Sequence, residues 1–277
     1  MKIKYVCPFW GQEHLEAAAF VAKVIDHGFD GIEINLPTEG FFSNQFLKSI
    51  DNVRKINPAF NFIAQAIVPD VKNDIDDYRS SMEKRLQKLA GYQPDFINAH
   101  TGKDYYSFDD NCRIIEACMN ISAKSGISIL HETHRGRFSF HATTLIPYLE
   151  RFPELKLVGD LSHFCVVSES LLQDQETYLQ KIFPHISHLH ARVGHEQSPQ
   201  VNDPFAKEWE SHLKIFLDWW NEIILCNHQQ AKEIFTVCPE FGPAPYMPAI
   251  SSTQNPIAYQ WNINVAMKNY LQENLQS

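Results

Sequence analysis

The chain has 277 residues, of which 44% are apolar, enough for one large α/β domain or two small ones. Its formal net charge is −9 and no cluster of Lys or Arg stands out, which argues against nucleic acid as a partner because phosphate binding needs a basic surface. No apolar run approaches the roughly 18 residues of a membrane-spanning helix, so we expect no membrane partner.

Apolar runs that end in polar residues recur along the whole chain. In order, they cover residues 2–9, 30–37, 60–68, 95–102, 127–134, 156–163, 186–193 and 233–240. Most of their polar ends are about 30 residues apart, which is the length of a strand and its return helix. These runs are therefore predicted to be strands.

The segments between these runs carry apolar residues at helical spacing. The first such set is Leu15, Ala18, Ala19, Ala22 and Ile25. Gly28 and Gly126 stand where a C-cap glycine is expected. The tail from about Pro256 to Leu271 is predicted to be a closing helix.

Eight alternating units of this length predict a (β/α)8 TIM barrel, with residues 1–277 as a single domain. An open doubly wound sheet is the rival, but no G-x-G-x-x-G follows the first strand. Two long loops, at about 193–208 and 241–255, follow strand ends and should therefore lie on the active face, where such loops often form lids.

Four side chains of the metal-ligand type stand at the ends of four successive runs: Glu132, Asp160, His190 and Glu240. One such residue alone is commonly a helix cap or a surface residue, but the C-terminal ends of barrel strands meet at one mouth. Three carboxylates and one imidazole suit Mn²⁺, Mg²⁺ or Co²⁺ at least as well as Zn²⁺. We therefore predict one divalent metal ion bound by these four residues.

Further polar residues are expected at the same mouth. Arg192 follows His190 by two residues, where it could hold an anionic or hydroxyl group of a substrate or pair with a neighbouring ligand carboxylate. Substrate contacts are also expected from His100, Arg135, Arg137 and Glu33, with Trp10, Asn35 and Gln65 as further mouth residues. His188 should lie one layer deeper than His190, and His131 should point outward.

The strand-end set, including His163 three residues after Asp160, resembles that of the xylose isomerase-like TIM barrels, and the resemblance covers essentially the whole chain. The segment GFDGIEINLP around Glu33 is also typical of that superfamily. Its members include sugar isomerases, ketose 3-epimerases, inosose dehydratases, 3-dehydroshikimate dehydratases and the endonuclease IV type of DNA repair enzyme. The motifs are specific for the superfamily and weak for any one activity.

The resemblance to the ketose epimerase branch implies that Glu132 and Glu240 also move a proton at the carbon next to a carbonyl. The metal would polarise that carbonyl and stabilise the enediolate, and His163 matches a position that contacts a substrate oxygen. The predicted function is therefore a divalent-metal-dependent isomerase or epimerase of a small sugar, sugar acid or polyol.

Two other functions stay open. In the dehydroshikimate dehydratases a histidine in the position of His134 resembles a general base, so a metal-dependent lyase is the first alternative. His134 could instead only pack in its loop or bond a carboxylate. The second alternative is a catalytically inactive sugar-binding barrel. A DNA repair role is rejected, because Gln65 and Phe205 stand where that branch has histidines and the net charge is negative.

The expected partner is a small polyhydroxylated molecule, and the expected location is cytoplasmic. The N-terminal run is too short for a signal peptide, and the six cysteines form no C-x-x-C pair, which suggests buried thiols in a reducing compartment. A homo-oligomer stays open, because the aromatic residues Trp219, Trp220 and Tyr246 suit either a core or an interface.

Overall fold

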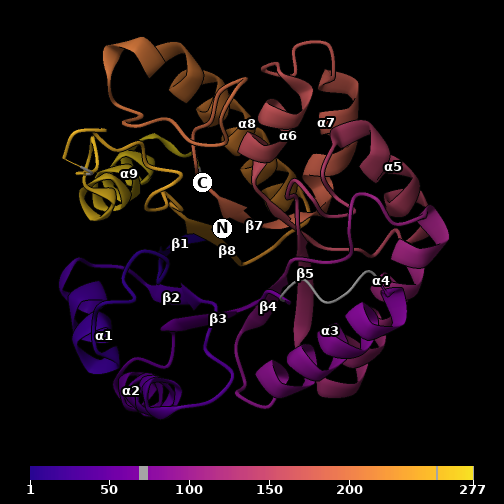
Figure 1. The fold of residues 1–277 in the computed structure, drawn as a ribbon, viewed down its shortest axis with the longest axis horizontal. Coiled ribbons are helices and arrows are strands. Elements are labelled where there is room, and N and C mark those ends of the chain that lie inside the picture. Colours follow the sequence, from indigo (N-terminus) through magenta and orange to yellow (C-terminus); the bar gives the residue numbers. More distant parts are fainter. Residues whose placement is uncertain (69–73, 254, 277) are drawn as a thin grey trace.

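The computed structural model of the protein describes residues 1–68, 74–253 and 255–276. Eight parallel strands close into a barrel in chain order, with helices around the outside (Figure 1). Strand β1 completes the ring by pairing with β8. The predicted (β/α)8 barrel is therefore confirmed, and the open doubly wound sheet is excluded because a closed ring has no switch point.

Each predicted strand run contains one strand of the barrel. The strands are β1 (Lys2–Pro8), β2 (Gly31–Ile34), β3 (Asn61–Ala66), β4 (Phe96–Ala99), β5 (Ser128–Glu132), β6 (Leu157–Gly159), β7 (Ile186–His190) and β8 (Ile234–Cys238). Most of them end earlier than predicted. The polar residues at the ends of the runs lie at the last strand position or just beyond it, where the backbone leaves the sheet.

Helices follow the strands on the outer face of the barrel. They are α1 (Ala17–Asp26), α2 (Phe41–Ile56), α3 (Ile75–Ala90), α4 (Phe108–Ser125), α5 (Ala142–Arg151), α6 (Leu161–Ser168), α7 (Glu176–Ile182), α8 (Glu210–Gln229) and α9 (Gln260–Asn274), with short 3-10 turns η1 (Phe183–His185) and η2 (Lys207–Trp209). The closing helix α9 starts later than predicted. None of the described helices combines the length and the apolarity that crossing a membrane would require.

The first helix forms as predicted, but it buries a different face. Phe20, Val21 and Val24 are buried, whereas Ile25 is exposed. The larger side chains bury more apolar area than the alanines whose spacing indicated the helix, and burial of apolar area decides which face turns inward. Gly126 ends α4 in the left-handed conformation (φ 73°), as a C-cap glycine does.

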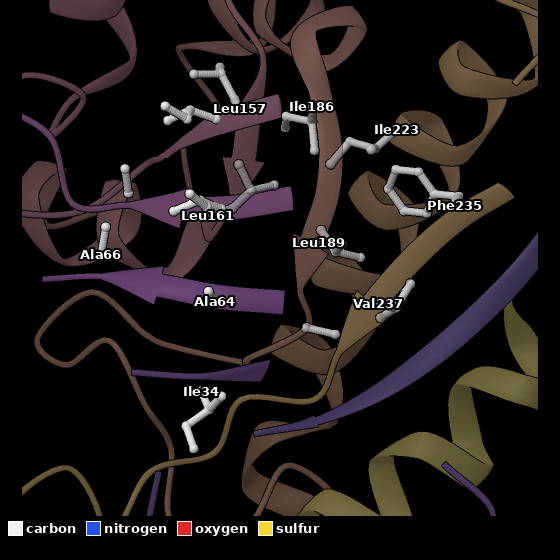
Figure 2. Close-up of a cluster of buried hydrophobic side chains, with 14 of the residues drawn as sticks. Ile34, Ala64, Ala66, Leu157, Leu161, Ile186, Leu189, Ile223, Phe235 and Val237 are labelled. Atoms are coloured by element: carbon white, nitrogen blue, oxygen red, sulfur yellow. The ribbon is translucent and has the colours of Figure 1, made fainter. Parts of the chain in front are cut away.

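Most of the hydrophobic core lies between the barrel wall and the helices. Figure 2 shows side chains of this layer from five strands, together with Leu161 of α6 and Ile223 of α8. Inside the barrel, Val6, Ile63 and Cys238 form a small apolar cluster that is separate from this layer, with Phe96 packed against it. The interior above this cluster is occupied by polar side chains, which build the site described below.

The cysteines behave as the sequence suggested. All six lie within the described residues and are free thiols, and all except Cys226 are buried. Burial raises the pKa of the Cys118 thiol to about 12, so this group stays protonated and unreactive near neutral pH.

Trp220 should be the costliest aromatic residue of α8 to remove. Its side chain is fully buried in the core, whereas Trp219 is only partly buried. We expect Trp220→Ala to lower the free energy of unfolding by about 3–5 kcal/mol, because it leaves a large cavity. Urea unfolding followed by circular dichroism measures this change.

Leu225→Ala is the matched control on the same helix. Leu225 is 54% exposed, so its truncation should change the stability by less than about 0.5 kcal/mol. Equal losses in the two variants would contradict the placement of Trp220 in the core.

Candidate metal centre and substrate cavity

Glu132, Asp160, His190 and Glu240 meet at the C-terminal mouth of the barrel. One ligand-type atom from each residue lies within 4.8 Å of those of the other three, and all four residues are buried. Glu132 and His190 are the last residues of β5 and β7, Asp160 follows β6, and Glu240 lies just past β8. The structure thus brings together the four residues that the strand spacing singled out.

Asp160 is held through its backbone and through both oxygens of its carboxylate. Thr133 Oγ1 accepts a hydrogen bond from the Asp160 amide (2.8 Å) and donates one to the Asp160 carbonyl (2.9 Å). Asp160 Oδ1 caps α6 by accepting from the amide of Ser162 (3.1 Å). The other oxygen, Oδ2, accepts from Arg192. Asp160 is therefore a helix cap and a member of the four-residue group at once.

His190 presents one ring nitrogen to the group. Its Nε2 lies 3.1 Å from both carboxylate oxygens of Glu33. Its Nδ1 lies 2.9 Å from Glu240 Oε2 and 3.8 Å from Glu132 Oε1, yet it makes no aligned hydrogen bond with any described residue. A buried nitrogen aimed at carboxylates without a hydrogen bond is what a metal ligand requires.

The two oxygens of Glu132 face different neighbours. Oε1 faces His190, whereas Oε2 accepts from Asn98 Nδ2 (2.7 Å) and lies 3.0 Å from His100 Nε2. The ring of His134 packs beside that of His100, with centroids 4.5 Å apart. His100, Glu132 and His134 form a second group of ligand-type residues with Glu132 in common.

Arg192 is the cation closest to the four-residue group. Its side chain is only 2% exposed, it donates to Asp160 Oδ2, and its Nη1 lies 3.7 Å from Glu240 Oε2. Its Nη2 also lies 3.0 Å from His163 Nε2. Arg192 reaches the mouth as expected, and in this structure it forms the ion pair with a ligand carboxylate that was its alternative role.

Tyr246, from the long loop after β8, closes this side of the mouth. Its ring centroid is 5.0 Å from the guanidinium carbons of both Arg135 and Arg192. Arg135 Nη2 donates to its hydroxyl (2.9 Å). The loop was expected on the active face, and Tyr246 fixes the positions of two cations there.

A cavity of about 450 Å³ opens beside the four-residue group, a size that suits a small-molecule ligand. Eight of the lining residues were singled out from the sequence: Trp10, Asn35, Gln65, His100, Glu132, His134, Arg192 and Glu240. The others were missed as lining residues: Phe9, Glu13, Pro37, Ile67 and Tyr246. Phe9, Pro37 and Ile67 lie within three residues of a strand end, and that position was the signal that could have found them; Glu13 and Tyr246 lie farther along their loops.

Four residues expected to contact substrate do not line this cavity. Glu33 lies beneath it, in contact with His190 and Gln65. His163 is fully buried, between the ring of His134 and the guanidinium of Arg192. Arg135 is engaged with Tyr246, and Arg137 has two buried nitrogens without a hydrogen-bond partner among the described residues. Direct substrate contact by these four residues is thus not supported by the lining of the cavity.

The pKa shifts show that the buried carboxylates of the group depend on nearby positive charge. Burial alone would raise the pKa of Glu132, but His100 and His190 hold it well below its usual value. Burial alone would lower the pKa of His190, but Glu240 and Glu33 raise it well above its usual value. The pKa of Asp160 is raised because burial outweighs the effect of Arg192. Buried carboxylates in this condition favour a bound cation.

The pKa values of His134 and His163 shift in the direction opposite to that of His190. The pKa of His134 is well below its usual value because the ring is buried and lies beside His100. Burial and the neighbouring His134 and Arg192 lower the pKa of His163 in the same way. Both rings are therefore neutral at physiological pH.

Comparison with known proteins identifies the fold. No family model and no curated protein matches the chain. Among solved structures, the chain is similar to the probable 3-DHS dehydratase AsbF from Bacillus anthracis, with a TM-score of 0.64 and 17% identity over 97% of this chain and 98% of that one. It is also similar to a xylose isomerase domain containing protein from Salmonella typhimurium, with a TM-score of 0.66 and 12% identity over the full length of both chains.

A third similar structure, a xylose isomerase-like TIM barrel protein from Mycobacterium smegmatis, is in complex with magnesium. Its TM-score is 0.60, with 12% identity over 98% of this chain and 95% of that one. At such identities the likeness establishes the fold alone. The chain has the fold of the xylose isomerase-like TIM barrel superfamily, as the sequence resemblance implied.

Metal binding should stabilise the protein through the four-residue group. A ligand at 100 times its Kd adds about 2.7 kcal/mol to the free energy of unfolding. We expect excess Mn²⁺ to raise the Tm measured by differential scanning fluorimetry, and EDTA to reverse the rise. Asp160→Asn should abolish most of the response, because it removes one charged ligand while keeping a residue that can cap α6.

Glu208→Gln serves as the control, since it removes one exposed carboxylate outside the group. It should leave the Mn²⁺ response intact. A response that survives in Asp160→Asn would show that the ion binds elsewhere.

Proposed function

We propose that the protein is a divalent-metal-dependent isomerase or epimerase of a small sugar, sugar acid or polyol, which acts by proton transfer next to a carbonyl. One observation carries this proposal. Glu132 and Glu240 both line the cavity and both belong to the four-residue group that could hold a metal ion. Two carboxylates are therefore available to the same substrate beside the same cation.

The donor set fits a hard divalent ion such as Mg²⁺, Mn²⁺ or Co²⁺, or Zn²⁺. Glu132, Asp160, Glu240 and His190 through Nδ1 would hold it. The ion would supply a fixed positive charge at a carbonyl oxygen, which makes the neighbouring C–H more acidic. The magnesium complex of the Mycobacterium smegmatis protein supports this choice of metal.

The carboxylates supply the proton transfer. One of Glu132 and Glu240 takes the proton from the carbon next to the carbonyl, and the C–H electron pair forms the double bond of an enediolate. For an epimer, the other of these two residues, protonated beforehand, delivers a proton to the opposite face of the same carbon; for an isomer, the first residue returns its proton to the adjacent carbon. No atom is gained or lost. Trp10, Phe9 and Tyr246 in the cavity wall limit the access of water.

A dehydratase is the second candidate, and His134 favours it. His134 lines the cavity, and its Nδ1 lies 2.6 Å from the carbonyl oxygen of Arg135, so Nε2 is the nitrogen left to accept a proton. In this reaction His134 removes the proton next to the carbonyl, the C–H pair forms a C=C bond, and hydroxide leaves the next carbon and departs as water once protonated. The likeness to a probable 3-DHS dehydratase agrees with this interpretation.

Proton exchange with solvent tests the leading proposal. Metal-loaded protein in D₂O should place deuterium at the carbon next to the carbonyl in a ketose or keto-inositol, as followed by proton NMR. Glu240→Gln should slow the exchange about 10²–10⁴-fold, because a neutral amide cannot take the proton. If every ketose and keto-inositol in a broad panel stays unlabelled, the isomerase proposal fails.

His134→Ala separates the two candidates. A dehydratase should lose activity about 10²–10⁴-fold while its metal content, measured by elemental analysis, stays unchanged. An isomerase should keep its proton exchange. His14→Ala, which truncates an exposed histidine, is the control and should change neither quantity. Full dehydratase activity in His134→Ala would remove His134 as the base.

A further inference from the structure

A buried polar layer lies beneath the four-residue group, and Glu33 is its centre. Glu33 comes from β2 and is only 1% exposed. Its Oε1 accepts from Asn98 Nδ2 (2.9 Å) and Gln65 Nε2 (3.2 Å), and its Oε2 lies 3.0 Å from His188 Nε2. His190 Nε2 lies 3.1 Å from both oxygens. This single carboxylate therefore ties β2 to β3, β4 and β7 across the interior.

These contacts determine which nitrogen of His190 carries the proton. A carboxylate surrounded by four donor groups accepts hydrogen bonds, so the His190 nitrogen that faces it is the one that donates. In the neutral ring that can bind an ion, the proton is then on Nε2 and the lone pair is on Nδ1, the atom aimed at Glu132 and Glu240. The contact with Glu33 also fixes the rotation of the ring.

We propose that Glu33 is a positioning residue for the metal group: it holds His190 in the tautomer and orientation in which Nδ1 can bind the ion. This inference rests on the proposed metal dependence of the protein and adds to it a residue that does not line the cavity. Partners of this kind behind a ligating histidine typically change metal affinity 10–100-fold.

The same contacts make Glu33→Gln a sharp test. The amide introduced by this substitution keeps the shape of the carboxylate but has one acceptor end and one donor end. Asn98 and Gln65 both donate to the Oε1 position, so the amide oxygen should settle there. The NH₂ group then faces His190 Nε2 and His188 Nε2. A donor at that place favours His190 with the proton on Nδ1, which is the wrong tautomer for binding an ion.

Metal affinity is the quantity to measure, by competition with a chromophoric chelator for Mn²⁺ or Zn²⁺. We expect Glu33→Gln to bind the ion about 10–100-fold more weakly than the wild-type protein, with unchanged circular dichroism. Excess metal should restore kcat in the variant, because the ligands themselves are intact. Neither result is expected if Glu33 only supports packing.

Thr236→Val is the matched control in the same layer. Thr236 Oγ1 contacts His188 Nδ1 (2.6 Å), and no contact with His190 accompanies it among the described residues, so this nearly isosteric change disturbs the layer but not the ligand. It should leave the metal affinity within about twofold of wild type.

Three outcomes would overturn the inference: Glu33→Gln binding as tightly as wild type, Thr236→Val weakened equally, or excess metal failing to restore kcat. None of these outcomes contradicts the proposed function as long as the wild-type protein binds the ion. If the wild-type protein binds no divalent ion, the proposed function and this inference fall together.

Discussion

The concentration of negative charge at one end of a closed barrel is the constraint on which the rest of the site depends. Glu33, Glu132, Asp160 and Glu240 are all buried there. Buried carboxylates that repel one another are stable only if cations or hydrogen-bond donors surround them. The surrounding side chains supply both: Arg192 pairs with Asp160, and His190 stands between Glu33 and Glu240. A divalent ion would complete the compensation, which is why the donor set is interpreted as a metal centre.

The same constraint explains why so much of the interior is polar. The cluster of Val6, Ile63 and Cys238 inside the barrel is small and separate from the large core cluster, so the main apolar packing lies outside, between the strands and the helices. The fold is thereby stabilised by one layer while another layer is free to carry chemistry. Such a separation lets destabilising groups, such as the buried carboxylates, persist at the site because the apolar packing outside the barrel offsets their unfavourable free energy.

The barrel and the four-residue group could be predicted from the sequence because both follow from periodicity. A strand and its helix repeat, and parallel strands bring their ends to one mouth, so Glu132 and Glu240 had to reach the same mouth once the ring closed. The lining by Tyr246 could not be predicted, since it depends on the course of a long loop. Glu33 was expected at the mouth, but its depth depends on how far β2 reaches along the barrel, and residue spacing does not reveal that.

The two halves of the chain contribute differently to the site. The four potential ligands all come from β5 to β8, whereas Phe9, Trp10, Asn35 and Ile67, from the loops after β1 to β3, contribute to the wall of the cavity without belonging to that group. Mutations in the early loops can therefore reshape what the cavity accepts without changing the four potential metal ligands. A barrel divided in this way can change the shape of its cavity through mutations in its first half while the second half keeps the potential ligands. The shape of the cavity and the set of potential ligands can then change independently on one scaffold.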